Sequence, residues 1–177
     1  SHNNLGLIFF THRDFQKAKS SYQKAIEVQP DYASAYNNLG LLFQTLGEAK
    51  KAINSYQKAI EVQPNFTEAY NNLGNTLKEL REYKKAISYY QKAIQIQPNY
   101  ADTHYNLGVA FNQLGKQEQS INCYQKVIEI NPNFSSAYLN LGVVFEELGE
   151  LQKAKGYYEK ALKLKPSSIN AQANISN

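Results

Sequence analysis

Five asparagines recur at a constant spacing of 34 residues along this 177-residue chain. They are Asn4, Asn38, Asn72, Asn106 and Asn140, and each stands directly before a Leu-Gly pair. Asparagine is a poor helix former because its amide competes with the backbone for hydrogen bonds. The same amide offers a donor and an acceptor together, which complement the main-chain groups of a second peptide. The spacing therefore predicts recognition of a main chain by hydrogen bonds.

Residue types that carry catalysis do not cluster in the sequence. The three histidines and the one cysteine, Cys123, are spread along the chain and show no zinc-ligand spacing. No glycine-rich phosphate-binding loop occurs, and the adjacent carboxylates Glu146 and Glu147 splay apart on a helix. His2 and His104 take sites that hold tyrosine in other units, which predicts packing at the edge of the core. We expect no catalysis, no metal and no cofactor.

The elements that position the asparagines are repeats of 34 residues. Other residues keep the same step, and they form the following series: Gly6, Gly40, Gly74, Gly108 and Gly142; Pro30, Pro64, Pro98, Pro132 and Pro166; Tyr22, Tyr56, Tyr90, Tyr124 and Tyr158. A strict period of this length indicates stacked supersecondary units that bury a continuous core between neighbours.

Each unit is predicted to form two helices. In residues 33–66 the apolar side chains of the first half follow helical spacing, and Gly47 is expected to end that helix with a positive φ. A second helix is expected from about Ala49 to Val62, where Pro64 stops it. Arg13 and Arg81 replace the turn glycine in two units. The residue after each proline, such as Asp31 or Asn65, is expected to cap the next helix.

This pattern resembles the tetratricopeptide repeat (TPR) family. The resemblance rests on Tyr36, Leu39-Gly40, Phe43, Ala52, Tyr56, Ala59 and Pro64 in the second unit and on their counterparts in the others. It implies an all-α fold, a right-handed superhelical solenoid of five helix-turn-helix units. It also implies protein or peptide binding in a concave groove lined by the first helix of each unit.

The expected domain is a single TPR array over residues 1–177. Its units are 1–32, 33–66, 67–100, 101–134 and 135–168, followed by a partial capping helix over 169–177. Asn174 in that last segment keeps the register of the five asparagines. Residue 1 corresponds to the third position of a unit, so we expect a longer parent protein.

Helical geometry places the asparagines on the stripe opposite the core-facing residues, at positions 2, 5, 6, 9 and 13 of each unit. Neighbouring helices lie about 8–10 Å apart and an extended chain advances about 3.3 Å per residue, so one asparagine per unit matches about every third residue of an extended peptide. The predicted peptide-binding residues are Asn4, Asn38, Asn72, Asn106, Asn140, Asn37, Asn71, Asn75, Tyr105 and Lys78. Two alternatives remain open: the asparagines tie neighbouring units together, or they are relics of recent duplication.

The asparagine-lined array is similar to the TPR superhelix of O-GlcNAc transferase-type proteins. The main prediction is an interaction scaffold that binds extended peptides through an asparagine ladder. The alternative is a substrate-recruiting arm of a larger enzyme, such as an O-GlcNAc transferase-like glycosyltransferase. Self-association through the end units is a third possibility, since Leu5, Ile8 and Phe9 of the first helix lack a preceding unit to cover them.

The two helices of each unit differ in their charged residues. The chain has 19 Lys and Arg against 15 Asp and Glu, yet Lys78 is the one basic residue on a predicted first helix. Those helices carry Glu68, Glu79, Asp102, Glu146 and Glu147. A nucleic-acid site needs a basic stripe, so we do not expect nucleic acid as a partner. No apolar run is long enough to span a bilayer, and the single cysteine suits a reducing compartment. We expect a cytoplasmic protein with protein or peptide partners.

Overall fold

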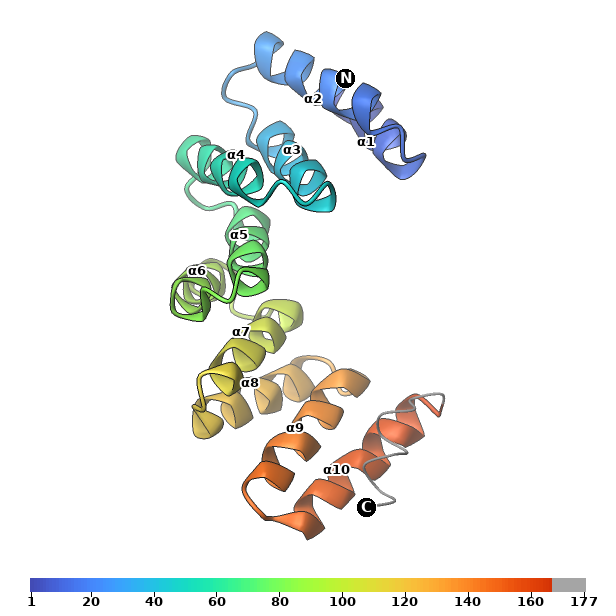
Figure 1. The fold of residues 1–177 in the computed structure, drawn as a ribbon, viewed down its shortest axis with the longest axis vertical. Coiled ribbons are helices and arrows are strands. Elements are labelled where there is room, and N and C mark those ends of the chain that lie inside the picture. The colour runs from blue at the N-terminus through green and yellow to red at the C-terminus, as the bar shows by residue number, and fades with distance from the viewer. Residues whose placement is uncertain (167–177) are drawn as a thin grey trace. The chain divides into compact units, whose positions relative to one another are not determined.

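The computed structural model describes residues 1–166, which form ten α-helices and no strand (Figure 1). Short turns join the helices in antiparallel pairs. The helices are α1 (His2–Thr11), α2 (Phe15–Val28), α3 (Ala33–Thr45), α4 (Ala49–Val62), α5 (Thr67–Glu79), α6 (Tyr83–Ile96), α7 (Ala101–Gln113), α8 (Gln117–Ile130), α9 (Ser135–Glu147) and α10 (Leu151–Leu164). The predicted partial helix over 169–177, with Asn174, lies outside the described residues.

Two compact parts make up the chain, and each repeats the same packing. The N-terminal part is Ser1–Gln97, and the C-terminal part begins at Pro98. In the N-terminal part, α1 packs on α2, α3 on α4 and α5 on α6, while α2 contacts α3 and α4 contacts α5. The first helices α1, α3 and α5 also contact one another in sequence. In the C-terminal part the pairs are α7–α8 and α9–α10, joined by contacts between α8 and α9.

A tyrosine from the second helix fills the centre of every pair. The rings of these residues are at most 2% exposed: Tyr22, Tyr56, Tyr90, Tyr124 and Tyr158. The glycine of the first helix is required by this contact, because a Cβ added at Gly40 would lie 2.6 Å from Cε1 of Tyr56. Carbon atoms pack at about 3.5–4.0 Å, so any larger residue would collide with the ring. Each glycine of this series is therefore needed to make room for the tyrosine that packs against it.

The turns inside the pairs follow the predicted pattern. Gly47, Gly115 and Gly149 have φ values of 74°, 69° and 76°. In the α3–α4 turn the Glu48 N–H donates to the Phe43 carbonyl at 2.8 Å, which satisfies a carbonyl left open by the end of the helix. Arg13 and Arg81 adopt the same backbone without glycine, with φ values of 59° and 60°.

The predicted caps of the first helices are wrong by one residue. The N-caps of α3 and α5 are Tyr32 and Phe66, and neither makes a side-chain capping bond. The reason is a turn between units, in which the Tyr32 N–H donates to the Gln29 carbonyl at 3.2 Å. Proline and the following Asp31 occupy the two central positions of this turn, where proline is favoured first. Asp31 therefore belongs to the turn, and the next residue, Tyr32, is the N-cap of α3.

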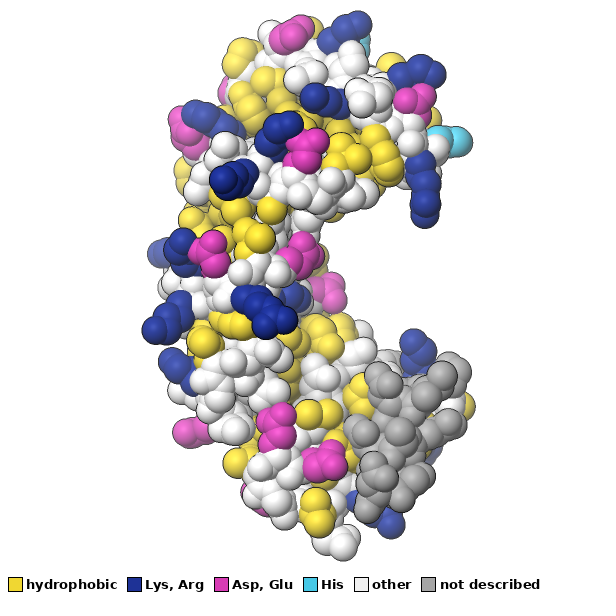
Figure 2. Space-filling view, in the orientation of Figure 1, with side chains coloured by type: hydrophobic (Ala, Val, Ile, Leu, Met, Phe, Trp, Pro, Cys, Tyr) yellow, Lys and Arg dark blue, Asp and Glu magenta, His cyan; other side chains and the backbone are white. Residues whose placement is uncertain are grey.

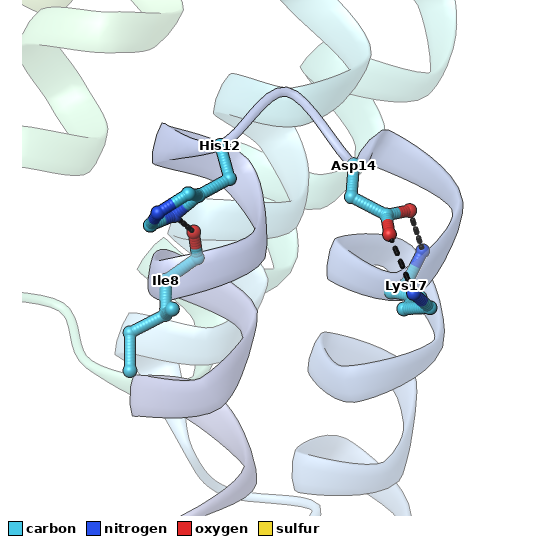
Figure 3. Close-up of polar contacts among 4 residues, drawn as sticks. All are labelled: Ile8, His12, Asp14 and Lys17. Carbon is cyan, nitrogen blue, oxygen red and sulfur yellow. Dashed lines mark hydrogen bonds and ion pairs between the residues drawn. The ribbon is translucent and has the colours of Figure 1, made fainter.

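The first pair has its own turn chemistry (Figure 3). Asp14 is the N-cap of α2: its Oδ1 accepts the Lys17 backbone N–H at 3.2 Å, and its Oδ2 pairs with the Lys17 ammonium at 2.9 Å. Hydrogen bonding to Lys17 lowers the pKa of the Asp14 carboxyl. His12 at the end of α1 is exposed, and its Nδ1 lies 2.8 Å from the Ile8 carbonyl oxygen. A carbonyl can only accept, so this geometry places the proton on Nδ1.

Replacing Arg81 by glycine should raise the free energy of unfolding by about 1 kcal/mol. A left-handed backbone costs a residue with a side chain about 1–2 kcal/mol, and the greater freedom of glycine in the unfolded chain offsets part of that gain. Urea denaturation followed by circular dichroism measures the change. The matched control is Gly47→Ala in the next turn upstream, which should lower stability by a similar amount. An Arg81→Gly chain no more stable than the parent would contradict the strain argument.

Candidate functional site

Each first helix carries two recurring side chains, and these form two rows within each of the two parts of the chain. The ladder asparagines are Asn4, Asn38, Asn72, Asn106 and Asn140, and the fifth-position residues that precede them are Asn3, Asn37, Asn71, Tyr105 and Leu139. In the N-terminal part the fifth-position asparagines are buried, with exposed fractions of 4%, 9% and 7% in chain order. Asn4 is exposed, whereas Asn38 and Asn72 are half-buried. The ladder row is therefore the more accessible of the two.

Hydrogen bonds join the two rows across the unit boundaries. The amide Nδ2 of Asn38 donates to Oδ1 of Asn3 at 3.0 Å, and Nδ2 of Asn72 donates to Oδ1 of Asn37 at 3.0 Å. Asn3 in turn donates to the Tyr32 hydroxyl at 3.3 Å. The bonds of Asn38 and Asn72 each link a ladder asparagine to the preceding unit. The hypothesis that the amides tie neighbouring units together is therefore confirmed for Asn38 and Asn72.

The ladder asparagines are only partly used by these bonds. A side-chain amide has two N–H donors and a carbonyl with two lone pairs. The carbonyl oxygens of Asn38 and Asn72 accept no hydrogen bond from residues 1–166. The inter-unit bond thus fixes the amide at its nitrogen and leaves its oxygen available.

The C-terminal part replaces the amide partner with a phenol. Nδ2 of Asn140 lies 3.2 Å from the hydroxyl of Tyr105 and 3.2 Å from that of Tyr124. Tyr105 and Leu139 take the fifth positions, and both are half-buried. Asn106 is half-buried on α7. The ladder position is therefore kept in this part, although the row behind it changes from polar to largely apolar.

The hydroxyls of the buried tyrosines reach polar residues of the first helices, which the sequence analysis did not predict. Tyr56 donates to Oε1 of Gln44 at 2.9 Å, and Nε2 of Gln44 donates to Oε1 of Glu79 in the next unit at 2.9 Å. Tyr90 donates to Oδ1 of Asn75 at 2.8 Å. The signal was present in the sequence, since all five sites hold tyrosine and none holds phenylalanine.

Burial keeps these tyrosine hydroxyls protonated. It raises the pKa of Tyr22 and of Tyr124 to about 12. For Tyr56 and Tyr90 burial raises the pKa further, and the nearby Glu79 carboxylate adds to the shift. A protonated hydroxyl donates a hydrogen bond, so Tyr56 and Tyr90 hold Gln44 and Asn75 in place. The side-chain oxygen of Asn75, a predicted binding residue, is therefore already hydrogen-bonded to the Tyr90 hydroxyl.

Lys78 is the remaining predicted site residue. It lies half-buried near the end of α5, and burial lowers the pKa of its ammonium while the adjacent Glu79 opposes that shift. A partly desolvated ammonium is drawn to anionic groups more strongly than one in open water. Lys78 is the one Lys or Arg within the first helices α1, α3, α5, α7 and α9.

The remaining basic residues lie on the second helices and their turns. Lys58 pairs with Glu61 at 2.7 Å on α4, and Lys85 pairs with Glu82 at 2.5 Å at the start of α6. Figure 2 shows dark-blue Lys and Arg side chains along α4 and α6 of the N-terminal part, with magenta acids beside α5. The predicted separation of charge between first and second helices is present in this part.

The other residues considered for chemistry have structural roles. His104 is buried as predicted, and its Nε2 lies 2.7 Å from the Pro98 carbonyl oxygen. The matching prediction for His2 is wrong, because that side chain is exposed at the start of α1. Cys123 is buried, which raises the pKa of its thiol to about 12.

The described residues, 1–166, contain neither a cluster of metal ligands nor a membrane-spanning helix. No group of three or more His, Cys, Asp or Glu residues there could hold a metal ion. None of the helices described for this chain has the length and apolar character needed to cross a bilayer.

Comparison with known proteins settles the family. Tetratricopeptide repeat family models match residues 1–65, 67–100, 89–122 and 135–168, and a TPR repeat model matches 110–149. A crystal structure of MamA is 31% identical, with 91% of this chain and 94% of that chain covered and a TM-score of 0.84. The chain belongs to the tetratricopeptide repeat family. Together with the ten helices, these matches confirm the predicted all-α repeat fold and a protein-binding scaffold of the TPR type.

Other solved TPR structures share the fold at lower identity. PilF of Pseudomonas aeruginosa is 25% identical, with 98% of this chain and 86% of that chain covered and a TM-score of 0.84. YrrB, described as a TPR protein with an unusual peptide-binding site, is 22% identical, with 99% and 91% covered and a TM-score of 0.83. No curated relative matches the chain.

Proposed function

We propose that this TPR array is an interaction scaffold that binds extended peptide segments along its first helices. In this proposal the ladder asparagines contact the main chain of the partner. The observation that carries it is that, within residues 1–166, the amides of Asn38 and Asn72 are hydrogen-bonded only at the nitrogen. Both donate a hydrogen bond to the preceding unit, while their side-chain oxygens accept no hydrogen bond from the described residues. A carbonyl so placed accepts a main-chain N–H of a bound segment.

Tying the units together and binding a partner are compatible roles for one amide. A hydrogen bond at the nitrogen fixes the rotamer, so the side chain is ordered before the partner arrives. Ordering a flexible side chain on binding costs about 0.5–1.5 kcal/mol, and a pre-ordered amide avoids most of that cost. The buried fifth-position residues Asn37 and Asn71 then support the ladder from behind.

Residues beside the ladder would select side chains of the partner. Asn75 and Lys78 follow Asn72 on α5, and Tyr105 lies next to Asn106 on α7. Main-chain bonds tolerate many sequences, so these flanking residues would supply the specificity. YrrB is a fold neighbour with a described peptide-binding site, but the proposal rests on the side chains of this chain. A substrate-recruiting arm of a larger enzyme would use the same residues.

Main-chain recognition can be tested by removing partner N–H groups one at a time. A linear peptide selected on the full chain from a displayed library is remade with a single N-methyl group at each successive position. If the ladder reads the main chain, fluorescence anisotropy should show affinity losses of about tenfold, or about 1.4 kcal/mol, at about every third residue. A scan without periodicity would overturn the proposal.

The matched protein variants confirm the location. Asn38→Ala with Asn72→Ala should remove the losses at the corresponding peptide positions. Gln57→Ala with Gln91→Ala is the control, because these exposed residues keep the same 34-residue spacing on the second helices α4 and α6. Equal effects of the two double variants would place the peptide elsewhere.

A further inference from the structure

The first helices of the C-terminal part differ in chemistry from those of the N-terminal part. Where α3 and α5 have the buried amides Asn37 and Asn71 in the fifth position, α7 and α9 have Tyr105 and Leu139. Val109 and Val143 lie one helical turn further along the same stripe. All four of these side chains are partly buried and pack against the core cluster of α8, α9 and α10. They form an apolar face, defined here as Tyr105, Val109, Leu139 and Val143, on either side of the ladder asparagines.

Tyr105 is held rigidly within this face. Its ring lies 5.2 Å from that of Phe134 and 5.8 Å from that of Tyr124, both in tilted contacts. Its hydroxyl lies 3.2 Å from Nδ2 of Asn140. A ring fixed on two sides and at its hydroxyl offers apolar area to a partner at little cost in conformational entropy.

Acidic side chains border the apolar face. The helices α7 and α9 contain Asp102, Glu146 and Glu147, and neither helix contains Lys or Arg. Glu146 accepts the Tyr158 hydroxyl at 2.5 Å. Asp102 and Glu147 are exposed at opposite ends of the stripe, and neither forms an ion pair within residues 1–166. Their charge favours a cationic partner and disfavours the phosphates of nucleic acid.

We infer that this face selects partner segments in which an apolar side chain stands beside Lys or Arg. The apolar side chain packs on Tyr105 and Leu139, and the basic residue pairs with Asp102 or Glu147. The inference rests on the proposed function and assigns the ligand chemistry of one part of its site. In the N-terminal part the fifth positions hold Asn3, Asn37 and Asn71 in place of Tyr105 and Leu139, so that part lacks these two apolar contacts and does not select for the apolar residue.

The repeat supplies the variants that test this inference. Tyr105→Asn with Leu139→Asn converts the apolar face to the amide pattern of the N-terminal part, and Asn140 keeps an acceptor of the kind that Asn37 offers to Asn72. Asp102→Asn with Glu147→Gln removes the charge and keeps the size. A displayed library of linear peptides is selected on the parent chain and on both double variants, each first checked for helicity by circular dichroism.

Peptides selected on the parent should be enriched in an apolar residue next to Lys or Arg. Peptides selected on the first double variant should lose the apolar enrichment and keep the basic one. Peptides selected on the second double variant should lose the basic enrichment and keep the apolar one, and their affinity should depend less on salt concentration. A peptide-side test needs no folded variant: replacing the apolar residue by asparagine should weaken binding to the parent by at least about tenfold. Equal compositions on all three chains, acidic peptides on the parent, or no loss on that replacement would overturn the inference. The N-methyl scan reports separately on the proposed function.

Discussion

Replacing Gly142 by alanine should lower the stability of the α9–α10 pair by about 2 kcal/mol. A Cβ at this position would lie 2.9 Å from Cζ of Tyr158, and closer still to Cε1 and Cδ1 of the same ring. The ring cannot move aside, since it is 2% exposed and its hydroxyl bonds to Glu146. Overpacking of this kind costs about 1–3 kcal/mol and occasionally more. The better helix propensity of alanine returns about 1 kcal/mol, and the steric cost is the larger.

Gly156 in the same pair provides the matched control. It lies within α10, and a Cβ there would meet no atom within 4 Å. Gly156→Ala should therefore stabilise the pair by about 1 kcal/mol through helix propensity alone. Because repeat arrays open in local units, hydrogen exchange of the α9 and α10 amides measures both changes more directly than global denaturation. Destabilisation by both substitutions, or by neither, would contradict the packing argument.

The helices could be predicted from the sequence because their ends are set by local backbone chemistry. Gly47 needs a positive φ and Pro64 cannot continue a helix, so α4 lies where expected, from Ala49 to Val62. The first-helix caps failed because two local rules compete for Asp31. Its side chain suits an N-cap, but the preceding proline favours a turn that places it one residue too early.

The sequence was enough to predict which asparagines share a helix face, but not which residues they bond to. The period places Asn38 and Asn72 on one face, because residues at the same unit position share an orientation. The bonds, however, join the sixth position of one unit to the fifth position of the unit before it, 35 residues away. That offset depends on how far neighbouring helices shift along their axes, which no single helix encodes. The tyrosine hydroxyl contacts were missed for the same reason, since Tyr56 reaches Gln44 only through the packing of α4 on α3.

Asn72→Ala should lower the free energy of unfolding by about 1–3 kcal/mol, whereas a purely surface asparagine would cost less than about 1 kcal/mol. The difference follows from the bond to Asn37. Asn37 is 9% exposed, so removing the Asn72 amide leaves a buried carbonyl oxygen without its donor at 3.0 Å. Leaving a buried polar group unsatisfied costs about 1–3 kcal/mol. Urea denaturation of the parent and variant chains measures the loss.

Asn4→Ala tests whether the cost comes from the bond or from the residue type. Asn4 occupies the same position in the first unit but is exposed, and its side chain makes no hydrogen bond within residues 1–166, so this change should stay within about 0.5 kcal/mol. A double-mutant cycle on Asn37 and Asn72 should give a coupling of about 0.5–3 kcal/mol, as residues in contact do. Additive losses would remove the inter-unit bond as the cause. A strong coupling would mean that a ligand on the free side of the Asn72 amide meets a group already positioned by the fold.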